Sequence, residues 1–157
     1  MTPRIDVRKY LSTPSGQAML ALGKSAEAST LERKLLELVK LRTSQINGCA
    51  YCIDMHSKDA RALGETEQRL YALNAWRETS FYSDRERAAL EWTEALARVA
   101  ESHMPDDLYE RVRAQFDEAE IVALTIAAVA TSGWNRLVIS FRVPAGTYQP
   151  QPALSTT

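Results

Sequence analysis

The sequence predicts an all-α protein of about seven or eight helices, on the basis of two observations. Apolar residues recur at three- and four-residue spacing along most of the chain, which is typical of helices that bury one face. No window alternates between apolar and polar residues over the length of a strand. The chain has 157 residues, of which 45% are hydrophobic and 25% charged, and we expect one domain over residues 1–157.

The N-terminal part of the chain is expected to contain two helices. Residues 4–11 form the first, which is short. Thr13 is a typical N-cap residue, and Pro14 suits the first position of a helix. These two residues therefore predict a second helix that runs to about residue 25.

Two longer helices are expected next, joined by a glycine turn. Ser29 and Glu32 have the spacing of a capping box, which predicts a helix over about 31–46. Gly48 ends that helix, and the following one is expected over 49–63.

The second half of the chain contains two further capping-box patterns, which begin at Ser83 and Asp117. They predict helices that run to about Val99 and Phe141. A shorter helix is expected over about 67–75, before the one that begins at Ser83. The chain breaks at His103-Met104-Pro105, and another short helix is expected after the break, over about 106–116.

The last predicted helix is apolar on almost every side from Ile121 to Ala130. Such a helix needs protein around it, and it is either a central core helix or one shared between the core and another subunit. The apolar run is too short to span a bilayer. Residues 147–157 are polar and contain proline, so we expect a flexible tail there and a folded core over about 14–141.

Charge and cysteine content exclude several classes of function. The chain has 19 basic and 20 acidic residues, so no basic surface for nucleic acid is expected. The first ten residues lack the apolar segment of a signal peptide, and no membrane partner is expected. Two cysteines in a CxxC pair indicate a cytoplasmic protein with redox or metal chemistry rather than a framework of structural disulfides.

The residues most suited to catalysis or metal binding lie in one short stretch. On a helix, Cys49, Cys52 and His56 fall within about 60° of one another, so two thiols and an imidazole share one face. A thiol at a helix start is favoured as a thiolate by the free N–H groups and the macrodipole. Spacing alone leaves three interpretations: a redox dithiol, buried cysteines without a chemical role, or a zinc site with His103 or a carboxylate as its fourth ligand.

Glu37 lies one predicted helix earlier, twelve residues before Cys49. A helical hairpin would bring it back past the cysteine helix, where its carboxylate could orient His56. Spacing alone favours an exposed acid that pairs with Arg33 or Lys40. The residues alone leave both interpretations open.

The pattern as a whole resembles the carboxymuconolactone decarboxylase superfamily, and within it the alkylhydroperoxidase D-like branch. The resemblance rests on Glu37, Leu41-Arg42-Thr43-Ser44, Asn47-Gly48-Cys49-Ala50-Tyr51-Cys52 and His56. This E-x11-C-x2-C-x3-H motif is specific, and the expected helical layout agrees with the family over about residues 14–141. Weaker similarity lies in three later segments, Asn74–Glu78, Glu91–Glu94 and Trp134–Arg136.

The resemblance implies an antioxidant thiol peroxidase or disulfide reductase, and no cofactor is expected. No metal is expected either, because only three good ligands are local and a closed zinc site needs four. By match to the family motif, Cys52 attacks the hydroperoxide, Cys49 resolves the product, and Glu37 and His56 form a proton relay. The helix dipole favours Cys49 as the thiolate, but His56 lies one turn after Cys52 and is better placed to serve it. The family also implies a homo-oligomer (trimer or hexamer) and a thiol reductant, which is a lipoylated protein, thioredoxin or a small thiol.

Two features depart from the family pattern. The best-studied members carry a histidine where this chain has Tyr51, so a shorter relay and weaker activity are expected. Some relatives also carry a longer N-terminal half. Two alternatives remain open: a lactone decarboxylase of aromatic catabolism, whose branch generally lacks the CxxC pair, and a non-catalytic thiol sensor or partner-binding protein.

Overall fold

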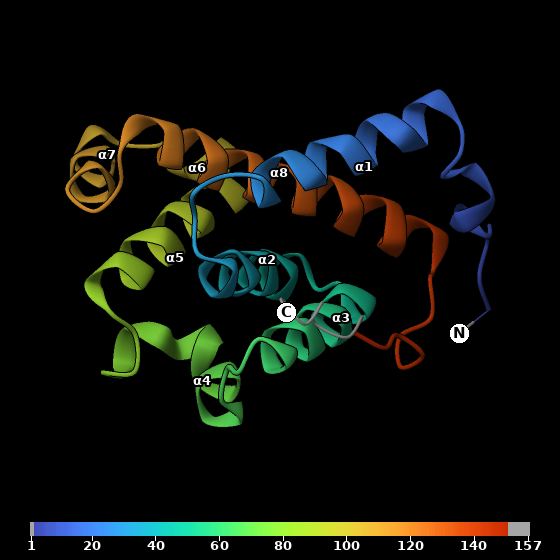
Figure 1. Ribbon diagram of the computed structural model, residues 1–157, viewed down its shortest axis with the longest axis horizontal. Coiled ribbons are helices and arrows are strands. Elements are labelled where there is room, and N and C mark those ends of the chain that lie inside the picture. The colour runs from blue at the N-terminus through green and yellow to red at the C-terminus, as the bar shows by residue number, and fades with distance from the viewer. Residues whose placement is uncertain (1, 151–157) are drawn as a thin grey trace, which may run out of the picture.

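The structure, a computed structural model, describes residues 2–150 of the chain (Figure 1). Eight α-helices and two 3-10 helices occur in these residues and no strand does, which confirms the all-α prediction. In chain order they are η1 (Val7–Tyr10), α1 (Pro14–Glu27), α2 (Arg33–Asn47), α3 (Ala50–Ala62), α4 (Glu67–Ala72), η2 (Leu73–Glu78), α5 (Asp84–Ala97), α6 (Val99–Ser102), α7 (Asp106–Arg113) and α8 (Glu118–Phe141).

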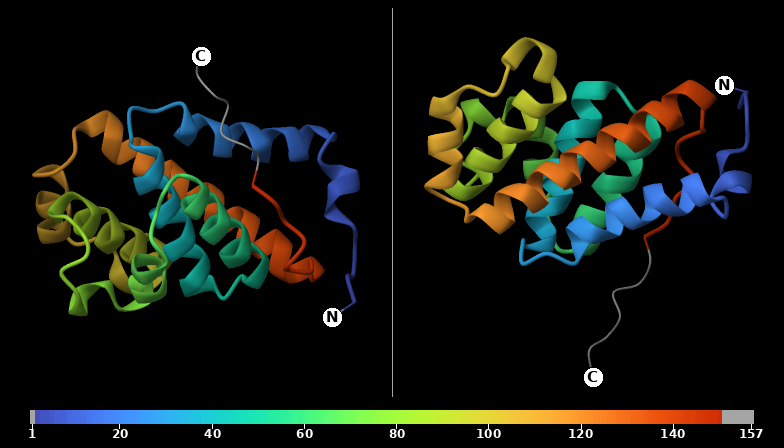
Figure 2. Two further views of the ribbon diagram at one scale, coloured as in Figure 1. Left: turned by 60° about the horizontal axis from the view of Figure 1, so that its bottom comes forward. Right: turned by 90° about the horizontal axis from the view of Figure 1, so that it is seen from above.

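The centre of the molecule is formed by α2 and α8. α1 lies along α8, while α5 packs against both central helices and carries α7 on its other side (Figure 1 and Figure 2). α3 folds back along α2. One group of buried side chains, which includes Leu36 and Leu124, joins α2, α5, α7 and α8, and a second, which includes Leu38 and Leu73, joins α2, α3, η2 and α5. The α2–α3 hairpin is therefore fixed to the core on both sides.

Helix starts follow the predicted capping chemistry at Thr13, Ser83 and Asp117. The Thr13 hydroxyl accepts a hydrogen bond from the N–H of Gly16, and the other two residues form complete capping boxes. Each of these side chains satisfies backbone N–H groups that have no partner inside the helix. The expected break after α5 is also present, because His103 and Met104 adopt positive φ between α6 and α7.

The capping box predicted at Ser29 is wrong. α2 begins at Arg33, and Glu32 is its N-cap residue without a side-chain hydrogen bond. The Ser29 hydroxyl instead donates to the carbonyl of Ala26 at 2.6 Å and accepts from the N–H of Leu31. This local turn at the end of α1 uses the serine before α2 starts.

α8 is the predicted core helix, with one face left uncovered. Leu124 and Asn135 are fully buried, whereas Val122 and Val129 are 57% and 51% exposed. The whole helix, longer than its apolar run, meets the length and composition needed to cross a membrane. Half of its most apolar window is buried, and α1, α2 and α5 pack against it, so in this fold it serves as the core.

The first residues of the predicted tail, 147–150, lie beside α3. The Tyr148 hydroxyl donates to Oδ1 of Asp59 at 2.8 Å, and the Tyr148 carbonyl accepts from Nζ of Lys58 at 2.9 Å. These contacts hold the segment against α3, which sequence periodicity could not reveal. Residues 151–157 of the predicted tail lie outside the described residues.

Candidate active site

A glycine turn between α2 and α3 sets the position of both cysteines. Gly48 has φ of +70°, in the left-handed region that suits glycine, and it ends α2. The N–H groups of Gly48 and Cys49 donate to the carbonyls of Gln45 and Ser44. Cys49 is therefore the N-cap residue of α3, and its sulfur accepts a hydrogen bond from the N–H of Cys52 at 3.3 Å.

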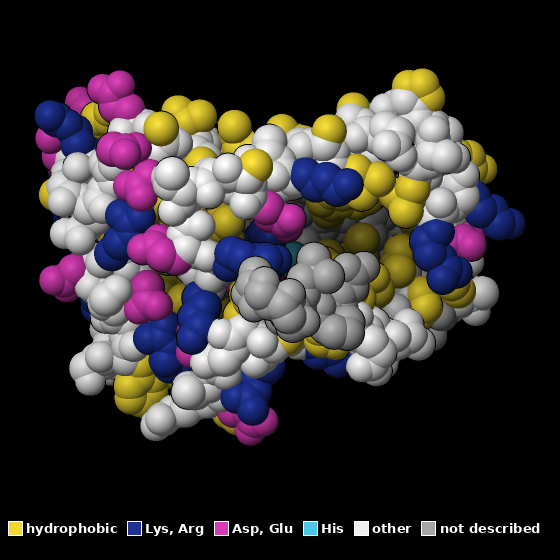
Figure 3. Space-filling model, viewed as in Figure 1, with side chains coloured by type: hydrophobic (Ala, Val, Ile, Leu, Met, Phe, Trp, Pro, Cys, Tyr) yellow, Lys and Arg dark blue, Asp and Glu magenta, His cyan; other side chains and the backbone are white. Residues whose placement is uncertain are grey.

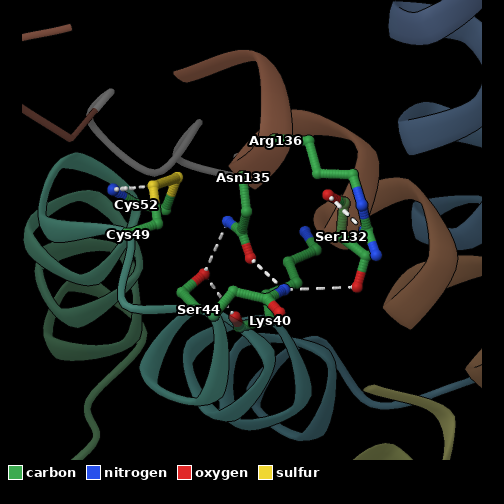
Figure 4. Close-up of a disulfide and its surroundings, with 8 residues drawn as sticks. Lys40, Ser44, Cys49, Cys52, Ser132, Asn135 and Arg136 are labelled. Atoms are coloured by element: carbon green, nitrogen blue, oxygen red, sulfur yellow. Dashed lines mark hydrogen bonds between the residues drawn. A yellow bond between two sulfur atoms is a disulfide. The ribbon is translucent and has the colours of Figure 1, made fainter. Parts of the chain in front are cut away.

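Cys49 and Cys52 form a disulfide, with their Cα atoms 5.3 Å apart. Figure 4 shows it on the side of α3 that faces α8. Both cysteines are buried, with 0% and 2% of their surfaces exposed. His103, considered above as a zinc ligand, is an exposed residue at the C-terminal cap of α6. The disulfide thus favours the redox interpretation of the CxxC pair.

Glu37 is buried rather than exposed, which overturns the interpretation of it as a surface acid. Its two carboxylate oxygens accept hydrogen bonds of 2.9 Å each, one from Nδ1 of His56 and one from Nζ of Lys40. Lys40 also donates to Glu27 of α1 at 2.8 Å. Burial raises the pKa of Glu37, but the hydrogen bonds from His56 and Lys40 and the positive charge of Lys40 outweigh it. The pKa of Glu37 lies below its ordinary value, so the group is a carboxylate.

The contact with Glu37 fixes the proton positions on His56. A carboxylate only accepts hydrogen bonds, so Nδ1 carries the proton and Nε2 is left as the basic nitrogen. His56 is itself buried and lies one turn after Cys52 on the same face of α3, as the spacing predicts. Within the described chain, no hydrogen bond joins His56 to the oxidised cysteines.

A second acidic side chain, Asp59, joins Glu37 and His56, and sequence reasoning missed it. One carboxylate oxygen of Glu37, one of Asp59 and a ring nitrogen of His56 lie within 4.8 Å of one another. The signal was present, because Asp59 follows His56 by three residues and so shares its helix face. The cluster suits a metal ion poorly, since Lys40 already places a positive charge on the Glu37 carboxylate.

A buried amide network fastens the cysteine turn to α8. Nδ2 of Asn47 donates to Oδ1 of Asn135 at 2.9 Å, and Nδ2 of Asn135 donates to the Ser44 hydroxyl at 3.2 Å (Figure 4). Asn135 is fully buried. Because Ser44 also accepts the N–H of Cys49 through its carbonyl, the network reaches the redox pair directly.

One groove of the molecule lies away from the cysteines. It has a volume of about 1230 Å³ and is lined by Ile53, Ser57 and Arg61 of α3 and by Arg42 of α2, among others. These α3 residues occupy a different face from Cys52. On the face drawn in Figure 3, hydrophobic side chains line a separate hollow between α1 and α3, over α8.

Two of the three weaker similarity segments, Asn74–Glu78 and Glu91–Glu94, meet at a second buried charge. Glu94 of α5 accepts hydrogen bonds of 2.8 Å from Nε1 of Trp76 and from Nε of Arg42, and a further one from Arg77. Burial raises the pKa of Glu94, but these donors outweigh it and hold the pKa below its ordinary value. The cluster ties η2 and α5 to α2 and has no contact with the cysteines in the described residues.

The fold and the site together define an all-helical protein with a CxxC disulfide and a buried Glu–His pair one turn beyond it. The sequence profile of the carboxymuconolactone decarboxylase family matches residues 14–95, and the chain belongs to this family.

Similar proteins agree with this membership. The uncharacterized protein YdfG of Bacillus subtilis (strain 168) is 45% identical over 135 residues, which span 85% of this chain and 92% of YdfG. The crystal structure of ATU0492 of Agrobacterium tumefaciens has a TM-score of 0.88 at 40% identity, and covers 94% of this chain and 100% of its own. ATU0492 is described as a protein of unknown function and a candidate antioxidant defence protein AhpD.

A more distant structure shares the fold alone. The debrominase Bmp8 has a TM-score of 0.72 at 19% identity, over 84% of this chain and 71% of Bmp8. The family fold is thus found in an enzyme as well as in proteins without an assigned activity.

Proposed function

We propose that this protein is an antioxidant thiol peroxidase that reduces hydroperoxides through the Cys49–Cys52 dithiol. The observation that carries the proposal is the placement of His56, which is held by the buried Glu37 carboxylate and lies one turn after Cys52. A redox dithiol needs a thiolate to attack, a second thiol to resolve the product, and a group that manages the proton. These residues supply all three.

The first step is removal of the proton from the Cys52 thiol. A free cysteine titrates near pH 8.5, so only a few per cent is thiolate at neutral pH without assistance. Nε2 of His56 takes the proton, and the Glu37 carboxylate at Nδ1 stabilises the imidazolium that results. Lys40 keeps Glu37 ionised, because the ammonium contacts its second oxygen.

The oxidation steps then balance as follows. The Cys52 thiolate attacks one oxygen of the hydroperoxide, the O–O bond breaks, and a sulfenic acid forms on Cys52. The leaving alkoxide takes the proton from His56 and departs as an alcohol. The Cys49 thiol displaces water from the sulfenic acid, and the disulfide forms. The sulfenic hydroxyl and the Cys49 proton leave together as that water.

A thiol reductant must return the disulfide to two thiols. Attack on one sulfur gives a mixed disulfide, and a second thiol of the reductant releases it. The burial of both sulfurs favours a slender thiol, such as a lipoyl group or a small dithiol, over a wide protein surface. A cytoplasmic location is consistent with this chemistry, since thiol reductants are maintained there.

We further propose that the protein works as a homo-oligomer. Val122 and Val129 are exposed one above the other on α8, which is the face expected for contact with another subunit. The trimer or hexamer implied by the family resemblance is the expected size. Light scattering of the purified protein tests it, and a monomer at micromolar concentration contradicts it.

The function is tested by peroxide consumption with purified protein. Wild-type protein is assayed with hydrogen peroxide and an alkyl hydroperoxide, and reduced lipoamide, thioredoxin and dithiothreitol are compared as reductants. We expect turnover in the wild type and loss of turnover in Cys52→Ser. Cys49→Ser should consume one equivalent of peroxide per protein and then stop, because it lacks the resolving thiol. If the protein consumes no peroxide with any reductant but its Cys49–Cys52 dithiol reduces a model disulfide, the protein is a disulfide reductase and not a peroxidase.

A further inference from the structure

The chain returns to the thiol site after α8 ends. Residues 143–150 run beside α3 (Figure 1 and Figure 2), and three hydrogen bonds attach them. The N–H of Gly146 donates to Oδ2 of Asp54 at 3.1 Å, and Nζ of Lys58 donates to the carbonyl of Tyr148 at 2.9 Å. The third bond, 2.8 Å long, joins the Tyr148 hydroxyl to Oδ1 of Asp59. The segment is thereby fixed beside the helix that carries the redox pair.

Asp59 is the point at which this C-terminal segment meets the proton relay. One oxygen of its carboxylate lies within 4.8 Å of a carboxylate oxygen of Glu37 and of a ring nitrogen of His56, so two carboxylates lie close to one imidazole. Both Glu37 oxygens are occupied by His56 and Lys40. The hydrogen bond that Asp59 receives among the described side chains comes from Tyr148.

We propose that Asp59 and Tyr148 are positioning residues of the thiol site. The Asp59 carboxylate gives the His56 imidazolium a second negative neighbour, and the Tyr148 hydroxyl holds that carboxylate in place and in its ionised form. The inference rests on the proposed function, because it assigns His56 the role of proton acceptor for Cys52.

The groups around Asp59 give the sign of the effect. Burial raises the pKa of Asp59 above its ordinary value, the hydrogen bond from Tyr148 opposes this, Glu37 raises the pKa further, and His56 and Lys40 lower it. These groups come from α2, from α3 itself and from the C-terminal segment. Loss of the Tyr148 hydroxyl therefore moves the protonation of Asp59 to higher pH, and it releases the carboxylate from its position next to His56.

Tyr148 is suited to this task because it stays neutral. Burial and the Asp59 carboxylate raise the pKa of Tyr148 well above its ordinary value. A phenol that does not ionise remains a donor throughout the working pH range. Without its hydroxyl, the Cys52 thiolate and the His56 imidazolium form less readily, and the thiol titrates at higher pH.

The experiment measures alkylation of Cys52 by iodoacetamide in the reduced full chain, as a function of pH, by peptide mass spectrometry. The variants are Tyr148→Phe, Asp59→Asn and the double variant, and Tyr71→Phe is the control, since Tyr71 is 75% exposed and donates to Glu67. We expect each single variant to slow alkylation at pH 7 by about threefold to tenfold and to raise its midpoint by about half a pH unit or more. The double variant should be no slower than Asp59→Asn.

Two outcomes overturn the inference. One is a wild-type pH profile in Tyr148→Phe while Tyr148→Ala is slow, because the ring would then only pack. The other is additive slowing in the double variant, because the hydroxyl would not act through Asp59. His56→Gln is run alongside, and unchanged alkylation in it overturns both this inference and the relay. If alkylation is slower in Tyr148→Phe but the wild type does not turn over peroxide, the inference is supported and only the proposed peroxidase activity is contradicted.

Discussion

Nδ1 of His56 donates a hydrogen bond of 2.9 Å to the Glu37 carboxylate, across the contact between α2 and α3. The two residues are nineteen positions apart and both are buried. Neither an isolated helix nor local spacing brings them together, because the contact requires the hairpin that Gly48 makes possible. The Glu37–His56 contact, and with it the proposed relay, therefore depends on the fold and not on the CxxC sequence alone.

The first prediction is that Glu37→Gln and His56→Gln each lower peroxide turnover by at least about tenfold, because general-base assistance is typically worth about 10²- to 10⁴-fold. The two residues act as one unit, so the double variant should be little worse than either single. Turnover and the pH dependence of Cys52 alkylation are measured in all four proteins. Glu67→Gln, a change at a mostly exposed acid on α4, is the matched control. Wild-type turnover and thiol titration in both single variants would contradict the relay.

The second prediction is that the Cys49–Cys52 disulfide is reversible. Reduction should give two alkylatable thiols, and mild peroxide treatment should remove two hydrogens between them, because the two residues already bond within one turn of α3. Intact-mass spectrometry with thiol labelling follows both states. Sulfinic acid on the two cysteines, with no bridge between them, is the outcome that contradicts a resolving role for Cys49.

The third prediction is that the cluster around Glu37 binds no stoichiometric metal ion. The Lys40 ammonium contacts the Glu37 carboxylate at 2.9 Å, so a cation there would be repelled by a buried positive charge. Elemental analysis of protein purified without chelator should give well under one equivalent of zinc, both as purified and after incubation with zinc. Stoichiometric zinc that raises the melting temperature would contradict this and the redox proposal with it.

Much of this site could be predicted from sequence, since the motif names Glu37, Cys49, Cys52 and His56 and helical spacing aligns the last three. The hairpin that brings Glu37 to His56 was also an expectation from the glycine turn. Asp59 shares the same helix face and was within reach of the same argument.

Other parts could not be predicted, because they depend on how distant segments pack. Tyr148 lies 89 residues from Asp59, and nothing local to either residue indicates that the chain returns there after α8. The Ser29 pattern failed because a serine can cap a helix or close a turn, and the end of α1 decides between them. The exposure of Val122 is likewise set by which helices cover α8.

The fourth prediction concerns acid. The folded-state pKa of Glu37 is below its ordinary value of 4.5, so the unfolded chain binds the proton more tightly. The stability that this carboxylate contributes is fully present above pH 4.5 and is lost as pH falls through the lower folded value. In urea denaturation, the free energy of unfolding of the wild type should therefore fall below pH 4.5. In Glu37→Gln the free energy of unfolding should depend less steeply on pH over the same range. Equal slopes in the two proteins would contradict the shift.

The last prediction concerns the amide network that fastens the cysteine turn to α8. Asn135 is fully buried, accepts a hydrogen bond from Asn47 and donates one to Ser44. Asn135→Leu keeps a similar volume but leaves the amide of Asn47 without its 2.9 Å acceptor and the Ser44 hydroxyl without a donor. An unsatisfied buried polar group typically costs about 1–3 kcal/mol, so we expect the free energy of unfolding to fall by that amount. Urea denaturation of the oxidised protein gives this difference from the midpoint, provided the slope is unchanged.

Ser132→Ala is the matched control for this change, because Ser132 lies one turn earlier on α8 and accepts from Asn47 only at 3.4 Å. It should alter the free energy of unfolding by less than about 0.5 kcal/mol. The Asn135 variant should also loosen the turn that holds Cys49, since Ser44 accepts the Cys49 N–H at 3.0 Å. Hydrogen exchange at the Cys49 amide should then be faster in Asn135→Leu than in Ser132→Ala. An Asn135→Leu protein as stable as the wild type, with unchanged exchange at Cys49, would mean that packing alone fixes the turn and that the network is dispensable.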